Sequence, residues 1–170
     1  KNGVLIFEIA RPSIHNAINF EVLEGFEKMA DIIRQNDTIK LAVITGQGEK
    51  SFCSGGDLSI FHKLKTEEES YNMLISAAKT LYRIATLEVP TIALINGTAV
   101  GGGCEIATLC DYRLVKEGAK CGFIQGKLAI TTGWGGGSYL LEKGLRHDYA
   151  MRMLTEAVPY QSDELLSFGW

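Results

Sequence analysis

The sequence has few of the residues that build a metal site or a disulfide framework. Its 170 residues include three histidines and four cysteines, and no C-x-x-C spacing joins Cys53, Cys104, Cys110 and Cys121. This pattern argues against structural zinc and against a disulfide-stapled fold. We therefore expect free thiols and no metal. Because no signal-peptide pattern is visible, we expect a cytoplasmic protein.

Two further absences narrow the possible partners. No run of Lys or Arg stands out and the net charge is −3, so a nucleic-acid surface is not expected. The longest apolar runs are well short of the ~20 residues that cross a bilayer, so no membrane span is expected. The hydrophobic fraction of 46% and the charged fraction of 22% are those of an ordinary globular protein. The length suits one domain, which we place over residues 1–170.

Apolar strands and amphipathic helices alternate along the chain, which indicates an α/β fold. Strands are predicted at residues 4–10, 41–45, 91–95, 112–115 and 120–123. Helices are predicted after Asn19, after the capping box Thr66 to Glu69, after the glycines at 101–103, and at 138–143, 148–154 and 162–168. For the helix after the capping box, we expect a buried stripe of Tyr71, Leu74, Ile75, Ala78, Leu81, Tyr82 and Ala85.

The chain is organised around residues 89–111, VPTIALINGTAVGGGCEIATLCD, in which a strand leads through glycines into a helix that carries Glu105. A helix N-terminus offers backbone N–H groups to a negative charge. Gly102 and Glu105 are three residues apart and therefore share a face of the helix. This arrangement suits a thioester whose carbonyl oxygen becomes an oxyanion while a proton moves nearby. A second N–H donor is expected from the loop of Gly55 and Gly56.

A glycine loop after a strand can also form a dinucleotide site or a Walker A loop, or it can simply allow tight strand–helix packing. A dinucleotide site requires G-x-G-x-x-G near the first strand, and neither glycine cluster, at 101–103 or at 133–137, has that spacing. A Walker A loop requires G-x-x-x-x-G-K-[ST], which the sequence lacks. Two glycine clusters together with a suitably placed acid favour a functional site.

Three segments resemble the enoyl-CoA hydratase/isomerase (crotonase) family: RPSIHNAIN at 11–19, FCSGGDL at 52–58 and GTAVGGGCEIATLCD at 97–111. The resemblance implies a crotonase-like spiral of ββα units, assembled as homotrimers or as dimers of trimers. Members continue into a further helical segment, whereas this chain stops inside the motif that precedes it. We therefore expect an acyl-CoA-binding core that lacks most of the C-terminal helical segment.

The resemblance also implies an acyl-CoA substrate, with coenzyme A present only as part of that substrate. The thioester oxygen would lie between the N–H groups of Gly56 and Gly102, and Glu105 would be the acid/base. The family pattern places at the substrate His15, Ala17, Ser54, Asp57, Leu58, Gly101 and Gly103. Trp134 is expected as a wall of the acyl pocket or as a core residue.

One departure from the family pattern leaves the reaction open. Where hydratases carry a second glutamate in F-x-x-P-E, this chain reads FIQGK at 123–127 and places Lys127. We expect this lysine either to hold a substrate carboxylate or to face solvent. TTGWGGG at 131–137 resembles the S-W-G-G variant of 2-carboxyacyl-CoA decarboxylases. The first expectation is hydration or isomerisation of an enoyl-CoA. The alternatives are decarboxylation of an ethylmalonyl- or methylmalonyl-type substrate, or a non-catalytic binding module.

Overall fold

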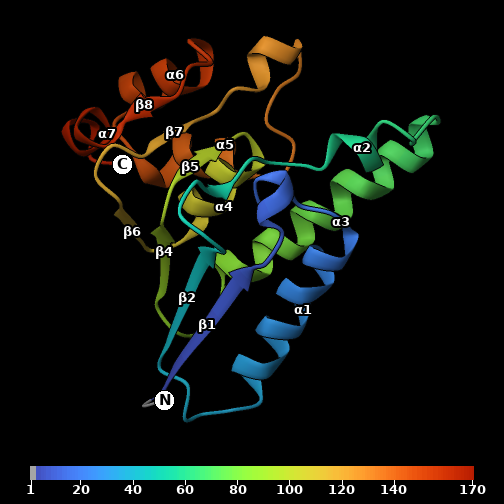
Figure 1. Ribbon diagram of the computed structural model, residues 1–170, viewed down its shortest axis with the longest axis vertical. Helices are drawn as coiled ribbons and strands as arrows, with labels where there is room; N and C mark the ends of the chain where they lie inside the picture. Colours follow the sequence, from blue (N-terminus) through green and yellow to red (C-terminus); the bar gives the residue numbers. More distant parts are fainter. Residues whose placement is uncertain (1–2) are drawn as a thin grey trace.

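The computed structural model describes residues 3–170, apart from the side chains of residues 143 and 144. Within this range the strands form two four-stranded sheets (Figure 1). The first sheet has the order β1 (Val4–Ile9), β2 (Leu41–Gly46), β4 (Thr91–Ile95) and β6 (Tyr112–Val115), all parallel. The second has the order β3 (Ser51–Cys53), β5 (Thr98–Val100), β7 (Lys120–Gly122) and β8 (Tyr160–Gln161), with β8 antiparallel to β7.

From β2 to α5, each turn of the chain adds one strand to each sheet and then one or more helices. After β2 and β3 come α2 (Leu58–Phe61) and α3 (Glu67–Ala85). After β4 and β5 comes α4 (Gly102–Leu109). After β6 and β7 come the 3₁₀ helix η2 (Gln125–Leu128) and α5 (Gly136–Tyr139). This repetition confirms the predicted α/β class and the spiral of ββα units.

Local sequence explains the first helix, α1 (Phe20–Arg34). The side chain of Asn19 accepts a hydrogen bond from the backbone N of Val22 at 3.0 Å, as an N-cap does. The buried residues of the helix are Leu23, Phe26, Met29, Ala30 and Ile33. Phe26 stacks on Phe7 of β1 with ring centroids 4.3 Å apart, so α1 lies on one face of the first sheet (Figure 1).

The helix α3 begins as predicted but buries a different face. Thr66 Oγ1 accepts from the N–H of Glu69 at 3.1 Å and Glu69 accepts from that of Thr66 at 3.0 Å, which confirms the capping box. The predicted buried stripe was wrong in part, because Tyr71 is 61% and Tyr82 is 70% exposed. The buried residues of α3 are Ala77, Thr80, Leu81 and Ile84. The buried face therefore combines Leu81 and Ile84 with the smaller Ala77 and Thr80, whereas Tyr71 and Tyr82 lie on a more exposed face.

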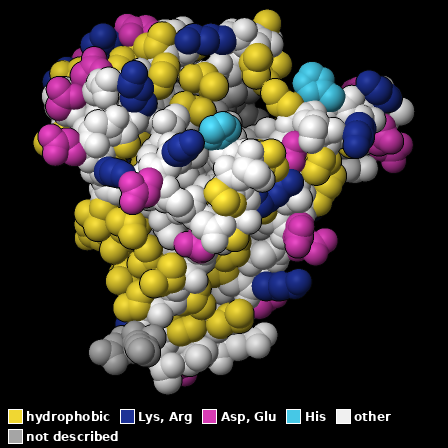
Figure 2. Space-filling view, in the orientation of Figure 1, with side chains coloured by type: hydrophobic (Ala, Val, Ile, Leu, Met, Phe, Trp, Pro, Cys, Tyr) yellow, Lys and Arg dark blue, Asp and Glu magenta, His cyan; other side chains and the backbone are white. Residues whose placement is uncertain are grey.

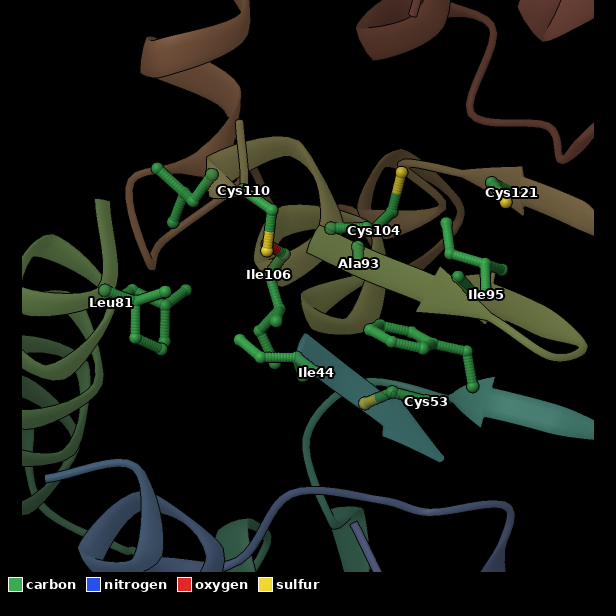
Figure 3. Close-up of a cluster of buried hydrophobic side chains, with 14 of the residues drawn as sticks. Ile44, Cys53, Leu81, Ala93, Ile95, Cys104, Ile106, Cys110 and Cys121 are labelled. Atoms are coloured by element: carbon green, nitrogen blue, oxygen red, sulfur yellow. The ribbon is translucent and has the colours of Figure 1, made fainter. Parts of the chain in front are cut away.

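The core fills the space between the two sheets and the helices (Figure 3). All four cysteines are buried in it as free thiols. Burial raises the pKa of Cys53 to about 12, so this thiol packs as a small apolar side chain. Trp170 ties the end of the described chain to the core, because its indole N–H donates to Thr108 Oγ1 of α4 at 2.9 Å.

Four further helical elements complete the fold of the described residues. They are η1 (Pro12–Ile14), the π-helical turn η3 (Leu140–Gly144), α6 (His147–Thr155) and α7 (Ser162–Phe168). The helix predicted at 138–143 therefore starts earlier, at Gly136, and divides into α5 and η3.

Figure 2 shows apolar side chains along the left edge, over the first sheet. Among residues 3–170, none of the helices combines the length and the apolar character that a membrane span requires.

Candidate active site

Three loops that are far apart in sequence meet at one edge of the second sheet. They follow β3, β5 and β7, which lie side by side and run parallel. The carboxyl ends of parallel neighbours lie at the same edge of a sheet, where α/β proteins place their ligands. The glycines at 55–56 and at 101–103 and the loop containing Trp134 are brought together in this way.

Two backbone N–H groups at this edge are free to bind an anion. Gly102 is the first residue of α4, and Gly101 before it has φ of 56° and ψ of −126°, a backbone conformation that favours glycine. A Cβ added at Gly55 would lie 3.1 Å from the backbone N of Gly102, so the two loops touch. Within the described part of the chain, neither the N–H of Gly56 nor that of Gly102 donates a hydrogen bond. The predicted donors are therefore adjacent and unused.

The Trp134 ring lies against both of these glycines. A Cβ added at Gly102 would lie 2.3 Å from a carbon of the six-membered ring, and one added at Gly56 would lie 3.4 Å from another. Phe61 packs edge-to-face on the same indole, with centroids 6.4 Å apart. Trp134 is 6% exposed. The two N–H groups therefore lie beside an aromatic wall, and electrostatic interactions are stronger where water is excluded.

Glu105 is the buried carboxyl group of the site, with 2% of its surface exposed. Its Oε2 accepts hydrogen bonds from the backbone N of Trp134 at 3.1 Å and of Gly136 at 3.0 Å. Its Oε1 accepts one from Nε2 of Gln125 at 2.9 Å. Burial raises the pKa of Glu105, and it outweighs the hydrogen bonds, which lower it. A carboxyl group with a raised pKa is suited to both taking and giving a proton near neutral pH.

The structure pairs Glu105 with Gln125, a residue that the sequence analysis did not single out, and leaves Lys127 exposed. Comparison with the F-x-x-P-E motif directed attention to position 127, two residues further on. Gln125 is the first residue of the 3₁₀ helix η2, and it is buried whereas Gly126 and Lys127 are exposed. The strand predicted at 120–123 ends before this residue, so strand alternation does not predict the direction of its side chain.

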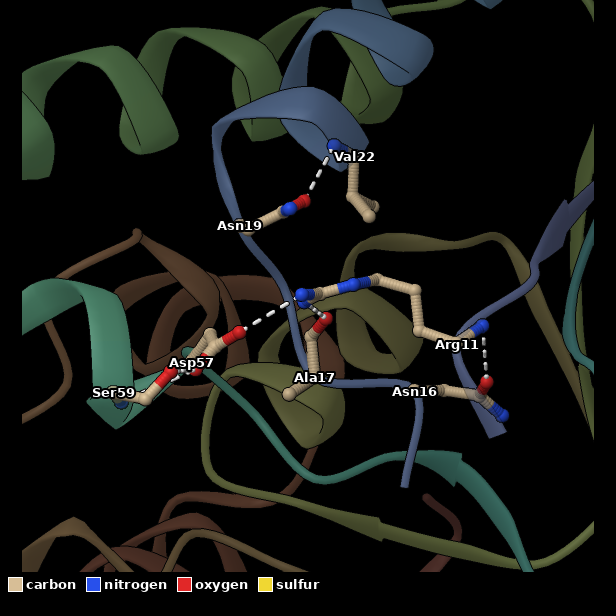
Figure 4. A network of polar contacts seen from close by, with 7 residues as sticks. All are labelled: Arg11, Asn16, Ala17, Asn19, Val22, Asp57 and Ser59. Atoms are coloured by element: carbon tan, nitrogen blue, oxygen red, sulfur yellow. Dashed lines mark hydrogen bonds and ion pairs between the residues drawn. The ribbon is translucent and has the colours of Figure 1, made fainter. Parts of the chain in front are cut away.

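Asp57 orders the loop that carries Gly56 (Figure 4). Its Oδ2 pairs with Arg11 at 2.9 Å, and its Oδ1 caps α2 by accepting from the backbone N of Ser59 at 3.1 Å. Bonds from Ser59 and the charge of Arg11 lower the pKa of Asp57. The backbone N of Asp57 also donates to the carbonyl of Ile18 at 2.8 Å. These contacts give Asp57 a role in holding the loop, in addition to its predicted place at the substrate.

The other predicted binding residues divide into exposed and buried positions. Ser54 lies beside His15, whose carbonyl accepts from the Ser54 N–H at 3.1 Å, and the His15 side chain is exposed. Leu58 is 53% exposed. Ala17 is buried, and its carbonyl accepts from Arg11 at 2.6 Å. Gly103 packs α4 on β3, since an added Cβ would lie 2.2 Å from the carbonyl oxygen of Cys53.

Two cavities adjoin this site. A mainly apolar groove of about 900 Å³ lies between α3 and α5, and its lining includes Ile75, Ala78, Tyr82, Leu109, Trp134 and Tyr139. A smaller cavity of about 280 Å³ is lined in part by Phe123, Gln125, Thr131, Thr132, Ser138 and Leu141. Trp134 thus contacts the glycines that carry the free N–H groups and also lines the groove. Among the described residues, no cluster of three or more His, Cys, Asp or Glu side chains could hold a metal.

Comparison with known proteins matches the whole chain, residues 1–170, to the family model Enoyl-CoA hydratase/isomerase. A short-chain-enoyl-CoA hydratase of Clostridium acetobutylicum is 34% identical over 98% of this chain and 63% of that protein. An ethylmalonyl-CoA decarboxylase of Xenopus tropicalis is 31% identical over 99% of this chain and 56% of that protein. The crystal structure of an enoyl-CoA hydratase from Bacillus anthracis superposes with a TM-score of 0.92 at 28% identity, covering 98% of this chain and 64% of that one. The chain thus spans less than two thirds of each relative.

Proposed function

The chain belongs to the enoyl-CoA hydratase/isomerase (crotonase) family, and on this premise we propose that it stabilises the enolate of an acyl-CoA thioester and adds water to an enoyl-CoA. One observation carries the proposal. A buried carboxyl group with a raised pKa, Glu105, lies on the same short helix as an unused N–H, that of Gly102, with the unused N–H of Gly56 alongside. Proton transfer and oxyanion stabilisation are the two functions that this reaction requires.

In the proposed hydration, Glu105 acts twice. Its carboxylate takes a proton from water while the water oxygen forms a bond to the β-carbon of the substrate. The π electrons of the α–β double bond move toward the thioester, and the negative charge rests on the oxygen between Gly56 and Gly102. Glu105 then returns the proton to the α-carbon, which restores the thioester and the carboxylate. One water has been added across the double bond.

We place the acyl chain in the groove between α3 and α5, with the indole of Trp134 as its inner wall. The apolar lining of that groove supports this placement. The coenzyme A part is proposed to run past His15, Ala17, Ser54 and Leu58 toward the surface, since His15 and Leu58 are exposed at the outer end of the loops that reach Gly56. Gly101 and Gly103 would flank the thioester.

Decarboxylation of a 2-carboxyacyl-CoA is the second candidate, favoured by the Trp134 motif and by Glu105, whose hydrogen-bond partners among the described residues include no second carboxyl group. In that reaction the bond from the α-carbon to the carboxylate breaks, carbon dioxide leaves and the electron pair forms the same enolate. Protonated Glu105 then gives its proton to the α-carbon. Lys127 is proposed here as an accessory cation for the substrate carboxylate. Lys127→Met would then raise KM for a 2-carboxyacyl-CoA and leave that for an enoyl-CoA unchanged.

The test compares crotonyl-CoA hydration with release of carbon dioxide from ethylmalonyl- and methylmalonyl-CoA. Glu105→Gln is expected to lower kcat by ~10²–10⁴-fold, the usual contribution of a general acid–base. Glu24→Gln, an exposed glutamate on α1, is the matched control and keeps its activity. Full activity in Glu105→Gln refutes the role of that residue. No turnover by the unmodified chain on any of these substrates supports the non-catalytic binding module instead.

Assembly and compartment are also proposals. We propose a homotrimer or a dimer of trimers in the cytoplasm, on the strength of family membership. Light scattering after size-exclusion chromatography would give the mass of the assembly. A monomer at micromolar concentration argues against the trimer for residues 1–170. We propose that these residues form one acyl-CoA-binding core.

A further inference from the structure

Gln125 has a buried amide oxygen for which the structure provides no partner. The residue is 9% exposed, and its Nε2 donates to Oε1 of Glu105 at 2.9 Å. Its own Oε1 accepts no hydrogen bond from any described residue. Buried amide oxygens are nearly always bonded to protein or to ordered water, so an exception indicates a missing group.

The surroundings of Gln125 suit a water molecule. Gln125 lines the cavity of about 280 Å³, together with the hydroxyl-bearing residues Thr131, Thr132 and Ser138. A water occupies ~30 Å³ in the liquid and needs two to four polar partners inside a protein. The cavity is large enough for several waters, and the hydroxyl groups together with the free amide oxygen supply partners. The same amide donates to Glu105 through its nitrogen, so a water bound to its oxygen would be separated from Glu105 by one amide group.

We propose that Gln125 holds the water that Glu105 activates, and that it takes the place of the second carboxylate of the site. Its Nε2 fixes one oxygen of Glu105, and its Oε1 accepts a hydrogen bond from the reacting water. Because a neutral amide takes up no proton near neutral pH, the proton still passes to Glu105 and Gln125 only positions the two reactants. This inference rests on the proposed hydration. It also gives Lys127, which is exposed, no part in handling the water.

This proposal predicts that replacement of Gln125 affects hydration and decarboxylation differently. Hydration consumes the water held by Gln125, whereas loss of carbon dioxide needs no water in the bond-breaking step. Replacement of Gln125 by Met, which has a similar shape and forms no such hydrogen bonds, is therefore expected to lower kcat for hydration by ~10–100-fold. KM should change less than threefold by our order-of-magnitude estimate, since Gln125 does not bind the acyl chain. The acidic limb of the pH profile should move to higher pH, because the bond from Gln125 favours the charged form of Glu105.

A matched control is Gln35→Met, an exposed glutamine at the end of α1. It should keep the rate and the pH profile of the unmodified chain. Circular dichroism and thermal melting of both variants show whether they fold. If Gln125→Met does not fold, Gln125→Glu keeps an acceptor for the water and should retain hydration with the acidic limb displaced to higher pH. An unchanged rate and an unchanged pH limb in the folded variant overturn the inference.

A crystal structure of the unmodified chain gives a readout that needs no turnover. An ordered water within hydrogen-bond distance of Gln125 Oε1 is expected, and an empty or sealed pocket there overturns the proposal. The two proposals can also fail separately. Loss of activity in Glu105→Gln with full activity in Gln125→Met refutes only the role of Gln125, whereas full activity in Glu105→Gln refutes the hydration mechanism itself.

Discussion

Gly136→Ala tests the contact that holds Glu105, the proposed acid/base, in place. Gly136 is the first residue of α5, and its N–H donates to Oε2 of Glu105 at 3.0 Å. A Cβ at this position would lie 2.5 Å from both the Cα and the Cβ of Glu105. Glu105 is in the middle of the buried helix α4, so the neighbouring backbone cannot yield by a simple change of rotamer. The loop containing Gly136 must move instead.

The expected loss of stability follows from opposing contributions. Overpacking a tight site costs ~1–3 kcal/mol, while alanine in place of glycine in a helix returns up to ~1 kcal/mol. If the loop moves far enough to break one bond to the carboxylate, a further ~1.5–3 kcal/mol is lost. The net loss is therefore ~0–3 kcal/mol with the bonds intact and ~1.5–6 kcal/mol if one of them breaks, and we expect the second case because the loop must move. For a domain of this length each kcal/mol lowers Tm by ~2–4 °C.

The assay is urea unfolding and thermal melting of Gly136→Ala beside Gly133→Ala. Gly133 lies in the same loop, but a Cβ there would meet only the end of the Leu74 side chain, at 2.8 Å. That flexible side chain can move aside, so we expect Gly133→Ala to stay within ~1 kcal/mol of the unmodified chain. Equal stability of the two variants would refute the reasoning, because it would mean that the loop is not seated on Glu105.

Three further predictions concern the same site. Trp134→Ala should lower the free energy of unfolding by ~3–5 kcal/mol, as for other buried aromatic truncations, and Trp134→Phe should cost clearly less in the same urea titration. Asp57→Ala removes the cap of α2 and should cost ~0.5–2 kcal/mol at neutral pH. Since the pKa of Asp57 is lowered, its contribution is present above the ordinary pKa of an aspartate and is lost as pH falls through the lowered value, so the gap between the two proteins should close in acid. Because the pKa of Glu105 is raised, hydration should fall on the acidic side with an apparent pKa above that of an ordinary glutamate; decarboxylation, which uses the protonated form, should fall on the alkaline side instead, and a flat profile for both contradicts the assignment.

Local signals in the sequence were sufficient to predict an element where one nearby residue determines the start of that element. The cap at Asn19 and the capping box at Thr66 both predicted the start of a helix correctly. The glycines before Glu105 predicted a helix N-terminus, whereas the short strands β3 and β5, which bring the glycine loops together, were not predicted. For each of these helix starts the physical cause lies within a few residues of the chain.

Prediction from the sequence failed where a distant neighbour decided the outcome. On α3 two faces carry apolar residues, and the sequence alone does not say which of them meets the core; Ala77 and Thr80 are buried because neighbouring elements approach closely there. At residues 125–127, spacing along a motif pointed to Lys127, while the turn of η2 directs Gln125 inward. The hydrogen-bond partner of Gln125 is Glu105, which lies 20 residues earlier in the chain.

The meeting of three loops at one edge also affects how the protein would acquire the proposed activity during folding. Every strand pairing except that of β7 with β8 is parallel, so each of those contacts closes a long stretch of chain. Folds dominated by such distant contacts form slowly, since the entropy of closure is lost before the contacts are gained. Neither half of the chain contains both the Gly56 N–H and the Trp134 backbone that holds Glu105. Activity should therefore return only with the last, global phase of refolding, and an enolate analogue should slow unfolding of the whole molecule rather than of one segment.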